Sequence, residues 1–408
     1  MTLRSKIYWK EILPSALSWL KDRFSSIWKN SSDSIKFGTL VYVVARLWLT
    51  LVSVFIFFKI PILSPSEFGG GYDRVLPLLT GWRGALLGMW QRWDTISYQS
   101  IAQWGYNQPF LTVFFPGYPL LGHAVSRFLQ ISDLAGLLLV SNCFAWLSLI
   151  LLHHIVRSLY DQHTANLALI FLVTFPSSFF LFAGYPQSMV LFFVLFCYWE
   201  AKQGRWLWAA LAALFAGLTH GTVVPLSLML AWQGFQTLKH TRFSLRWAIA
   251  LVPLMPMAGI ALFLSWRFSH GFEPFFLIQK QSWNMLTWMP WNPLILGVQK
   301  LVASKDIVIF INILISLLLI SAVVWEFKKL SCELKIYSVA LGLLLFSTGN
   351  IYDPLKSINR YALMMFPVFI YFAVITSQNK KLRLAIFEFN VLFHIYFCFI
   401  FFTWGWVG

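Results

Sequence analysis

The residues best suited to chemistry lie in a polar segment between two apolar runs, residues 90 to 119. If the segment is helical, one face carries side chains that recur every three or four positions, namely Trp90, Trp93, Asp94, Ser97, Tyr98 and Ile101. Gly105 is suited to end this helix, and Pro109 prevents its return. Because Trp and Tyr favour the boundary between lipid and water, we expect the helix to lie flat on a membrane surface. A single carboxylate, Asp94, would then stand at the mouth of a membrane domain.

Cations on the same predicted side of the membrane complement this carboxylate. The outer segments contain basic residues although membrane proteins usually concentrate them on the cytoplasmic side: Arg74, Arg83, Arg92, Lys280, Lys300, Lys305, Lys356 and Arg360. An anionic ligand would explain this excess. The alternative is that they extend to anionic lipid headgroups, which we favour for Lys300 and Lys305 beside a predicted span. Arg92 and Arg360 lie within dense aromatic motifs, which favours ligand binding.

One carboxylate near several cations at an aromatic membrane surface suits glycosyl transfer from a lipid phosphate. Asp94 would take a proton from the acceptor hydroxyl, and cations on the opposite side of one cleft would hold the departing phosphate. We expect residues 273–291 to close this cleft. Phosphate leaves as an anion, so no second carboxylic acid is needed to protonate it. The alternative role for Asp94 is structural, as an acceptor of backbone N–H groups that orders the interfacial helix.

The composition identifies the class of protein. The 408 residues are 59% hydrophobic, 18% aromatic and 11% charged, with a mean hydropathy of +0.69. This is more apolar surface than a soluble core can hide and indicates an all-α polytopic membrane protein. The formal charge of +16 is spread over short loops rather than gathered on one face, so nucleic acid is not an expected partner. The four cysteines and the few outer carboxylates show no metal-ligand spacing, so we expect no metal and no cofactor.

Apolar runs predict about eleven transmembrane helices, near 37–58, 134–156, 164–182, 187–200, 206–219, 222–236, 247–267, 306–325, 336–348, 360–377 and 385–404. Residues 1–36 form a basic segment that we expect to lie as an amphipathic helix on the cytoplasmic surface. We treat residues 37–408 as one transmembrane domain. The basic inner loops place the N-terminus in the cytoplasm. The outer loops are then 61–118, 268–305 and 347–359, the first containing interfacial helices.

Two motifs in the first outer loop resemble a known family. Arg-Trp-Asp-x-x-x-Tyr-x-x-Ile-Ala-x-x-Gly-Tyr (92–106), followed by Phe-Phe-Pro-Gly-Tyr-Pro (114–119), is similar to the PIG-V type mannosyltransferases of the GT-C superfamily. Further similar segments occur in order along most of the chain: Phe175-Pro176-Ser177 to Tyr185, Gly204-Arg205-Trp206, Glu273-Pro274-Phe275-Phe276 with Gln279, Trp283 and Pro290-Trp291, and Ser357 to Arg360-Tyr361 with Phe366-Pro367.

The resemblance implies a GT-C-like fold and an inverting glycosyltransferase. Its donor would be a polyprenyl- or dolichyl-phosphate sugar, with mannose the expected sugar. Its acceptor would be a glycolipid or glycan on the non-cytoplasmic side, as in GPI-anchor biosynthesis, and membrane lipids would surround it. Asp94 is the implied base. The residues expected at the donor phosphate and the substrates are Arg92, Trp93, Tyr98, Gln187, His220, Glu273, Gln279, Arg360 and Tyr361.

The sequence departs from this family at two positions. Where relatives commonly show Tyr-Thr-Glu-Ser, this chain has Tyr-Pro-Gln-Ser with Gln187, and where they show Leu-Thr-Arg it has Leu-Thr-His with His220. If the lost Glu and Arg pair in relatives, an amide and a His would keep a contact without buried charge. A changed sugar or acceptor, or a degenerate enzyme, would also account for the exchange.

Two other classes of function stay open. A secondary transporter would also have about eleven spans, but its ionisable sites lie near mid-membrane, whereas the candidates here, Arg46 and Glu200, lie nearer helix ends. A noncatalytic protein that binds a lipid-linked sugar is the other. Short loops and the absence of Asn-x-Ser/Thr from the outer loops favour a bacterial plasma membrane over the endoplasmic reticulum.

Overall fold

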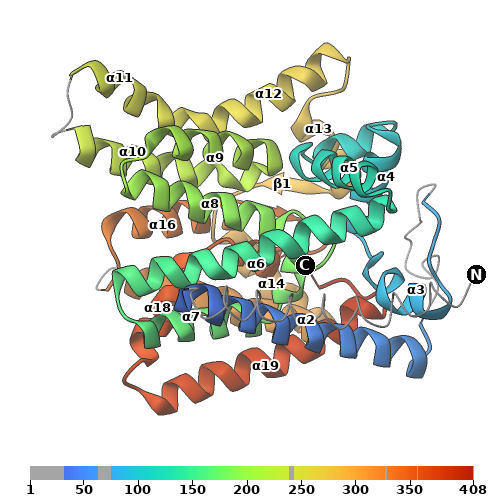
Figure 1. The fold of residues 1–408 in the computed structure, drawn as a ribbon. Coiled ribbons are helices and arrows are strands. Elements are labelled where there is room, and N and C mark those ends of the chain that lie inside the picture. Colours follow the sequence, from blue (N-terminus) through green and yellow to red (C-terminus); the bar gives the residue numbers. More distant parts are fainter. Residues whose placement is uncertain (1–31, 63–74, 239–242, 327–328, 356, 408) are drawn as a thin grey trace, which may run out of the picture.

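The computed structural model describes residues 32–62, 75–238, 243–326, 329–355 and 357–407. Most of these residues are helical, and the longer helices lie roughly parallel to one another (Figure 1). The predicted surface segment at 1–36 lies outside the described residues up to position 31, as do Arg74 and Lys356.

Five helical segments of the described chain are long and apolar enough to cross a membrane. They are α2 (Asp33–Lys59), α6 (Asp133–Leu159), the joined α11 (Phe243–Leu251), η6 (Val252–Leu254) and α12 (Met255–Ser269), α15 (Ile307–Glu326) and α19 (Lys380–Phe402). Their starts follow ordinary capping rules: the Ser132 hydroxyl accepts from the Ala135 N–H at the start of α6, for example. The chain is therefore an integral membrane protein.

Shorter helices complete the bundle: α7 (Gln162–Thr174), η4 (Ser178–Leu181), α8 (Gln187–Lys202), α9 (Trp206–Thr219), η5 (Gly221–Val223), α10 (Val224–Leu238), α16 (Cys332–Phe346) and α18 (Phe366–Thr376). The expected pair of spans around His220 is present as two separate helices, α9 and α10. Pro253 and Pro256 break the expected span at 247–267 into α11, η6 and α12. The total of eleven spans stays a prediction.

Two helices meet closely because glycines face each other across their contact. A Cβ atom on Gly217 of α9 would lie 2.1 Å from the Pro256 carbonyl oxygen, and one on Gly259 of α12 would lie 2.3 Å from the Leu214 carbonyl oxygen. No larger residue fits either position without separating the helices. This contact fixes α12 beside α9 at one edge of the bundle (Figure 1).

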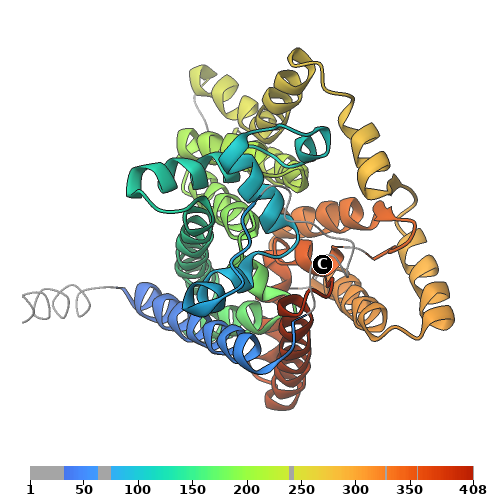
Figure 2. The same cartoon turned by 90° about the vertical axis from the view of Figure 1, so that its right-hand side faces the viewer.

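The segments that we expect to face outside are α3 (Gly81–Leu86), η2 (Gly88–Trp90), α4 (Asp94–Trp104), η3 (Pro109–Val113), α5 (Gly117–Leu129), α13 (Phe275–Trp283), β1 (Met285–Thr287), α14 (Asn292–Ser304), β2 (Thr348–Asn350) and α17 (Ile358–Ala362). Of these, α3, α4, α5 and α13 lie toward one end of the bundle, at the right of Figure 1. Viewed onto this end, the last described residues lie near its middle (Figure 2). The sequence did not predict the two strands. They pair antiparallel, with Met285 opposite Asn350 and Thr287 opposite Thr348.

Two expected helices differ from the structure at their starts. The helix expected from Trp90 begins only at Asp94, because Trp93 has φ of 52° and interrupts the helical path. The expected span at 360–377 is divided into α17 and α18, which leaves Arg360 on a short helix before the apolar run. Both breaks place a charged side chain at the end of the bundle rather than within a continuous helix.

Candidate active site

A cavity of about 620 Å³ opens among the segments at this end of the bundle. Its walls come from α4, α8, α10, α12, α13, β1, α16 and α17 and from the last residues of the chain. Seven of the residues predicted from the sequence border it: Asp94, Tyr98, Gln187, His220, Gln279, Arg360 and Tyr361. Three others, Arg92, Trp93 and Glu273, are not part of its lining.

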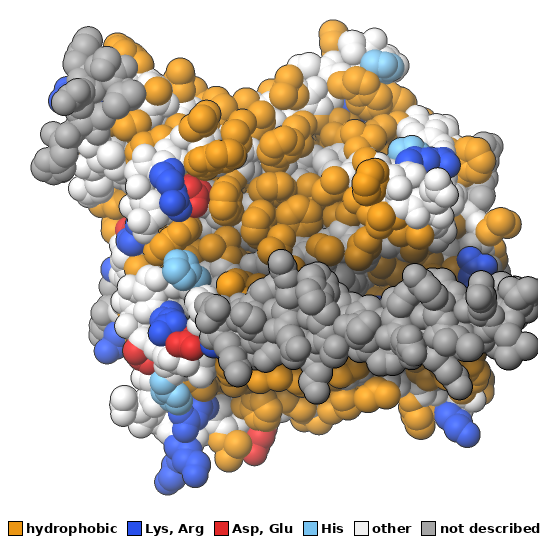
Figure 3. All heavy atoms as spheres, in the orientation of Figure 1, with side chains coloured by type: hydrophobic (Ala, Val, Ile, Leu, Met, Phe, Trp, Pro, Cys, Tyr) orange, Lys and Arg blue, Asp and Glu red, His pale blue; other side chains and the backbone are white. Residues whose placement is uncertain are grey.

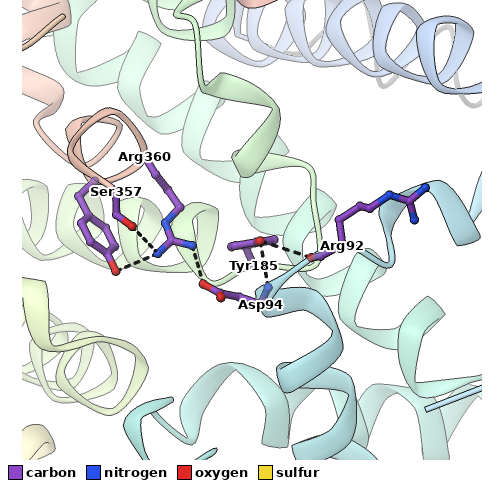
Figure 4. Close-up of polar contacts among 6 residues, drawn as sticks. Arg92, Asp94, Tyr185, Ser357 and Arg360 are labelled. Atoms are coloured by element: carbon purple, nitrogen blue, oxygen red, sulfur yellow. Dashed lines mark hydrogen bonds and ion pairs between the residues drawn. The ribbon is translucent and has the colours of Figure 1, made fainter. Parts of the chain in front are cut away.

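Asp94 and Arg360 meet at the centre of this site although 266 positions separate them in the sequence. The Arg360 Nη1 lies 2.5 Å from the Asp94 Oδ2, and the two side chains are 6% and 14% exposed respectively. Figure 4 shows them pointing toward each other. We predicted base and cations on opposite sides of a cleft; the structure instead places this carboxylate and this cation in direct contact. Among the described residues no hydrogen bond engages the other carboxylate oxygen, Oδ1.

The start of α4 holds Asp94 in place. The Asp94 N–H donates to the Tyr185 hydroxyl at 3.1 Å, and the same hydroxyl lies 3.4 Å from the Arg92 carbonyl oxygen. Gly184 permits this approach, since a Cβ there would lie 2.4 Å from the Thr95 Cγ2. The positive φ of Trp93 turns the chain so that the Asp94 side chain faces the cavity.

Hydrogen bonds from α6 hold the backbone just before α8 in place, and this backbone includes Tyr185. The Tyr118 hydroxyl bonds to the Leu137 carbonyl at 3.0 Å and to the Ser141 hydroxyl at 2.7 Å. Ser141 in turn donates to the Tyr185 carbonyl at 3.0 Å. The Tyr185 side chain, whose hydroxyl accepts from the Asp94 N–H, is therefore positioned by a buried polar network. Such networks are most effective when every group in them is paired.

Arg360 is held by polar partners and by aromatic rings. Its Nη2 donates to the Ser357 hydroxyl at 3.2 Å and to the Tyr361 hydroxyl at 3.0 Å. The guanidinium carbon lies 4.9 to 5.8 Å from the centres of four rings, those of Tyr361, Tyr185, Phe180 and Trp406. Burial disfavours its charge, but the oxygens of Tyr361 and Asp94 outweigh that effect and hold its pKa above the usual range. Arg360 is consequently a permanent cation at the cavity wall.

The tyrosines around the carboxylate stay protonated. Burial raises the pKa of Tyr98 and of Tyr185 well above the usual range, and the charge of Asp94 adds to this effect. Both hydroxyls are thus neutral hydrogen-bonding groups at any physiological pH. The site has one anion and one tightly paired cation at its centre.

Arg92 was predicted to bind the donor phosphate, but its guanidinium points away from Asp94 (Figure 4). Its Nη1 donates to the Gly88 carbonyl at 2.9 Å, its Nη2 to the Phe402 carbonyl at 3.2 Å, and its guanidinium lies over the Trp404 ring. These contacts bind the first outer segment to the end of α19. Arg92 and Asp94 are two positions apart, so even on one continuous helix their side chains would point to opposite faces, and the contacts with Gly88 and Phe402 hold Arg92 away from the cavity.

Trp93 also packs outside the cavity. Its indole N–H donates to the Gly405 carbonyl at 3.2 Å, and its ring contacts Trp404 and Trp406. Glu273, the third residue outside the lining, offers its carbonyl to Arg267 at 2.9 Å. Trp93 and Glu273 thus adjoin residues that form the walls.

Gln187 and His220 both border the cavity, at the start of α8 and at the break after α9. The expected contact between them is not formed, because the His220 Nδ1 is engaged by Thr222 and the Gln187 Oε1 has no hydrogen-bond partner among the described residues. The sequence identified both positions but not their separate surroundings.

The segment from α13 to β1 forms the outer wall, as expected for residues 273–291. Gln279, Lys280 and Trp283 of α13 and all three residues of β1 line the cavity. The sequence analysis named Lys280 only as an outer cation and assigned no role to Tyr185, Ser357 or Trp406. Tyr185 and Ser357 lie in segments similar to the family, which was a usable signal; Trp406 lies in the last residues of the chain and had none.

No group of three or more His, Cys, Asp or Glu side chains with metal-binding geometry occurs in the described part of the chain.

Comparisons with known proteins show a partial similarity to sugar-transferring enzymes. No protein-family model matches the chain. A stretch of 184 residues, 42% of the chain, is 30% identical to the GPI alpha-1,6-mannosyltransferase 2 of Rattus norvegicus, and 181 residues are 31% identical to the protein of that name from Mus musculus. Each match covers 35% of the relative, so the chain spans about a third of the length of these curated proteins. Over part of its length, the chain is therefore similar to mannosyltransferases.

Proposed function

We propose that this protein is an integral-membrane mannosyltransferase that moves the sugar of a polyprenyl- or dolichyl-phosphate donor to a glycolipid or glycan acceptor on the non-cytoplasmic side. The observation that supports this most strongly is the contact of Asp94 with Arg360 in the wall of one large cavity. A carboxylate and a guanidinium are the two groups that such a transfer requires. The partial similarity to mannosyltransferases favours mannose as the sugar.

The proposed reaction uses Asp94 as a general base. Its Oδ1 takes the proton of the acceptor hydroxyl while that oxygen forms a bond to the anomeric carbon of the sugar. The bond from this carbon to the phosphate oxygen breaks on the opposite face, and the lipid phosphate leaves with the electron pair. The product is therefore inverted at the anomeric carbon.

Arg360 stabilises the leaving phosphate. A guanidinium presents two parallel N–H groups to phosphate oxygens, and Arg360 already directs its Nη1 and Nη2 to oxygen acceptors. Lys280, on α13 at the opposite wall, supplies a second positive charge at the cavity. The phosphate must draw Arg360 partly away from Asp94, which frees the base at the moment when the donor is in place.

The apolar part of the cavity suits the lipid of the donor. It is lined by side chains of α10, α12 and α16, namely Val224, Met257, Ile260, Leu264, Leu344 and Leu345. A polyprenyl chain buried against them would gain roughly 25 cal/mol for each Å² of apolar surface removed from water. The phosphate would then lie where this apolar lining meets Arg360.

The direct test uses purified protein in nanodiscs with a polyprenyl-phosphate mannose and a series of glycolipid acceptors. We expect release of polyprenyl phosphate together with a mannosylated acceptor. Donor binding without release would favour the noncatalytic sugar-lipid binding protein. Transport of a solute across proteoliposomes without any transfer would favour the transporter.

A further inference from the structure

Gln187 is a buried amide at the edge of the cavity. It is the first residue of α8 and follows Pro186, which also lines the cavity and offers no side-chain cap. Its side chain is 1% exposed, and its Oε1 lacks a hydrogen-bond partner among the residues that the structure describes. Buried carbonyl oxygens are almost always hydrogen-bonded, because an unpaired one forfeits its interaction with water. An acceptor beside a cavity therefore indicates a donor group on the ligand.

His220 presents the complementary group from another wall. Its Nδ1 accepts the Thr222 N–H at 3.2 Å and lies 2.9 Å from the Thr222 hydroxyl. Because Nδ1 is an acceptor, the ring proton is on Nε2, for which the described residues provide no acceptor. Burial and the charge of Arg360 lower the pKa of His220 to about 3, so the ring stays neutral. The Tyr361 and Phe115 rings, centred 5.2 and 6.3 Å away, hold its orientation.

Both residues adjoin the centre of the site. Gln187 lies two positions after Tyr185, and the Tyr185 hydroxyl accepts a hydrogen bond from the Asp94 N–H. His220 packs on Tyr361, whose hydroxyl accepts from Arg360. A ligand group in the cavity near Asp94 and Arg360 would thus meet two neutral groups, an acceptor on Gln187 and a donor on His220. A hydroxyl both donates and accepts, so it matches such a pair, whereas an anion would meet the Gln187 oxygen unfavourably.

We propose that Gln187 and His220 form the subsite that recognises the hydroxyl groups of the transferred sugar, and that they determine which sugar the protein accepts. This rests on the proposed function, since the ligand is then a sugar on a lipid phosphate. The phosphate is bound by Arg360 and Lys280, and the sugar by the two neutral residues. Loss of a hydrogen bond to a buried polar group reduces binding by about tenfold, which sets the size of the expected effect.

The test compares two lipids that differ only in the sugar. Affinities of the purified full-length protein in nanodiscs are measured for a short-chain polyprenyl-phosphate mannose and for the same polyprenyl phosphate without sugar. Gln187→Met keeps the length of the side chain but removes both polar atoms; His220→Phe keeps the ring but removes its N–H. We expect each change to weaken the sugar-bearing lipid about tenfold and to leave the affinity for polyprenyl phosphate unchanged.

Gln233→Met is the matched control. Gln233 is also a buried glutamine whose Oε1 has no partner in the described part of the chain, but it lies on α10 away from the cavity lining. Its replacement should change neither affinity. Thermal unfolding of each variant reports whether it has folded. If Gln187→Met does not fold, His220→Phe alone tests the subsite, with the same expected difference between the two lipids.

The outcomes separate the two proposals. If the wild-type protein binds neither lipid, the proposed function is wrong and the subsite with it. If it binds both lipids but the variants weaken them equally, the two residues serve the phosphate or the fold, and the sugar subsite alone is wrong. Variants that match the wild type with both lipids would overturn it as well.

Discussion

Asp94 and Arg360 neutralise each other, and both side chains are largely buried. A guanidinium without its carboxylate would be a buried charge held only by hydroxyls and rings, and such charges are costly. Removing either member therefore alters more than one group, and variants are best chosen to keep size and hydrogen-bonding capacity. Arg92, two residues before Asp94, provides a comparison because it is buried and bonded to backbone carbonyls instead.

Asp94→Asn tests the proposed base. The amide keeps an oxygen for Arg360 but cannot accept a proton, so turnover should fall by about 10² or more, the usual scale for loss of a general base. Donor affinity should stay the same or rise, since the phosphate no longer competes with a carboxylate for Arg360. Transfer assays and donor titrations on one preparation check both. Parental turnover would show that Asp94 is not the base.

Arg360→Lys tests the phosphate contact. A lysine keeps the positive charge but cannot bond at once to Asp94, Ser357 and Tyr361, and it lacks the planar fork that matches phosphate. We expect roughly tenfold weaker donor binding, about the value of one charged hydrogen bond. Arg92→Lys is the control: the contacts described for Arg92, to backbone carbonyls and the Trp404 ring, lie outside the cavity lining, so this change should lower the thermal unfolding midpoint without weakening donor binding. The reverse result would exchange the roles of the two arginines.

His220 should make stability depend on pH. Its pKa is about 3 in the folded protein, against 6.5 for an ordinary histidine, so the unfolded chain binds a proton first as the pH falls. The stabilisation is complete above pH 6.5 and is lost progressively as the pH approaches 3. Arg360 faces the ring and keeps its charge in that range, because the oxygens around it hold its pKa above the usual range. Unfolding midpoints between pH 7 and pH 4 should fall more steeply for the wild type than for His220→Phe; parallel curves would contradict this.

At the scale of elements, the walls of the cavity depend on close helix contacts. The approach of α9 and α12 requires Gly217 and Gly259, and α12 contributes Met257, Ile260 and Leu264 to the apolar lining. Small residues at such contacts let backbones pack within van der Waals distance in a membrane. A change there would act on the cavity from a distance.

Gly217→Ala should therefore destabilise the protein and alter donor binding. The added carbon would lie 2.1 Å from the Pro256 carbonyl oxygen, a backbone atom that cannot move by itself. Gly342→Ala in α16 is the matched control, because its added carbon would have Met365 Cε 3.8 Å away, an ordinary contact. A helix-interior Gly→Ala change at such a position is neutral or stabilising by about 0.5–1 kcal/mol. Equal unfolding midpoints for the two variants would refute the importance of the contact.

Sequence patterns predicted the positions of the helices better than they predicted the helix ends that carry the site residues. The apolar runs located α2, α6, α15 and α19 because length and hydropathy suffice for them. The break at Trp93 involves partners far along the chain, the Tyr185 hydroxyl and the Gly405 carbonyl, whereas the break between α17 and α18 directly precedes Pro367. No local signal shows such partners. For the same reason the sequence placed Asp94 and Arg360 in one site but put Arg92 there as well.

At the scale of the molecule, one face shows apolar side chains between two more polar ends. On the face in Figure 3, hydrophobic groups cover the middle, and Lys, Arg, Asp and Glu gather toward the ends. At the end that we expect to be cytoplasmic, ion pairs join neighbouring helices: Arg157 with Asp33 at 2.9 Å and Arg205 with Glu200 at 2.5 Å. The candidate active site lies at the other end. This arrangement is typical of a protein that spans a membrane.

The orientation can be measured directly. Single cysteines at Leu76, beside the outer segments, and at Gln203, between α8 and α9, are both placed at exposed positions in a background without the native cysteines. An impermeant thiol reagent applied to intact cells should label the cysteine at position 76 at once and that at position 203 only after permeabilisation. Gly70, within the same outer loop, lies outside the described residues. The opposite labelling pattern would reverse the predicted topology.

The short pairing of β1 with β2 joins two parts of the chain that are far apart in the sequence. β1 continues the wall begun by α13, and β2 lies on the path from α16 toward Ser357 and Arg360. Asn350 strengthens the connection through its side chain, which donates to the Trp283 carbonyl. The two strands thus connect the outer wall of the cavity to the segment that leads to Arg360. We therefore expect a displacement of α13 that admits a bulky acceptor to be transmitted through β1 and β2 to the segment before Arg360, which would link entry at the mouth to the position of the cation.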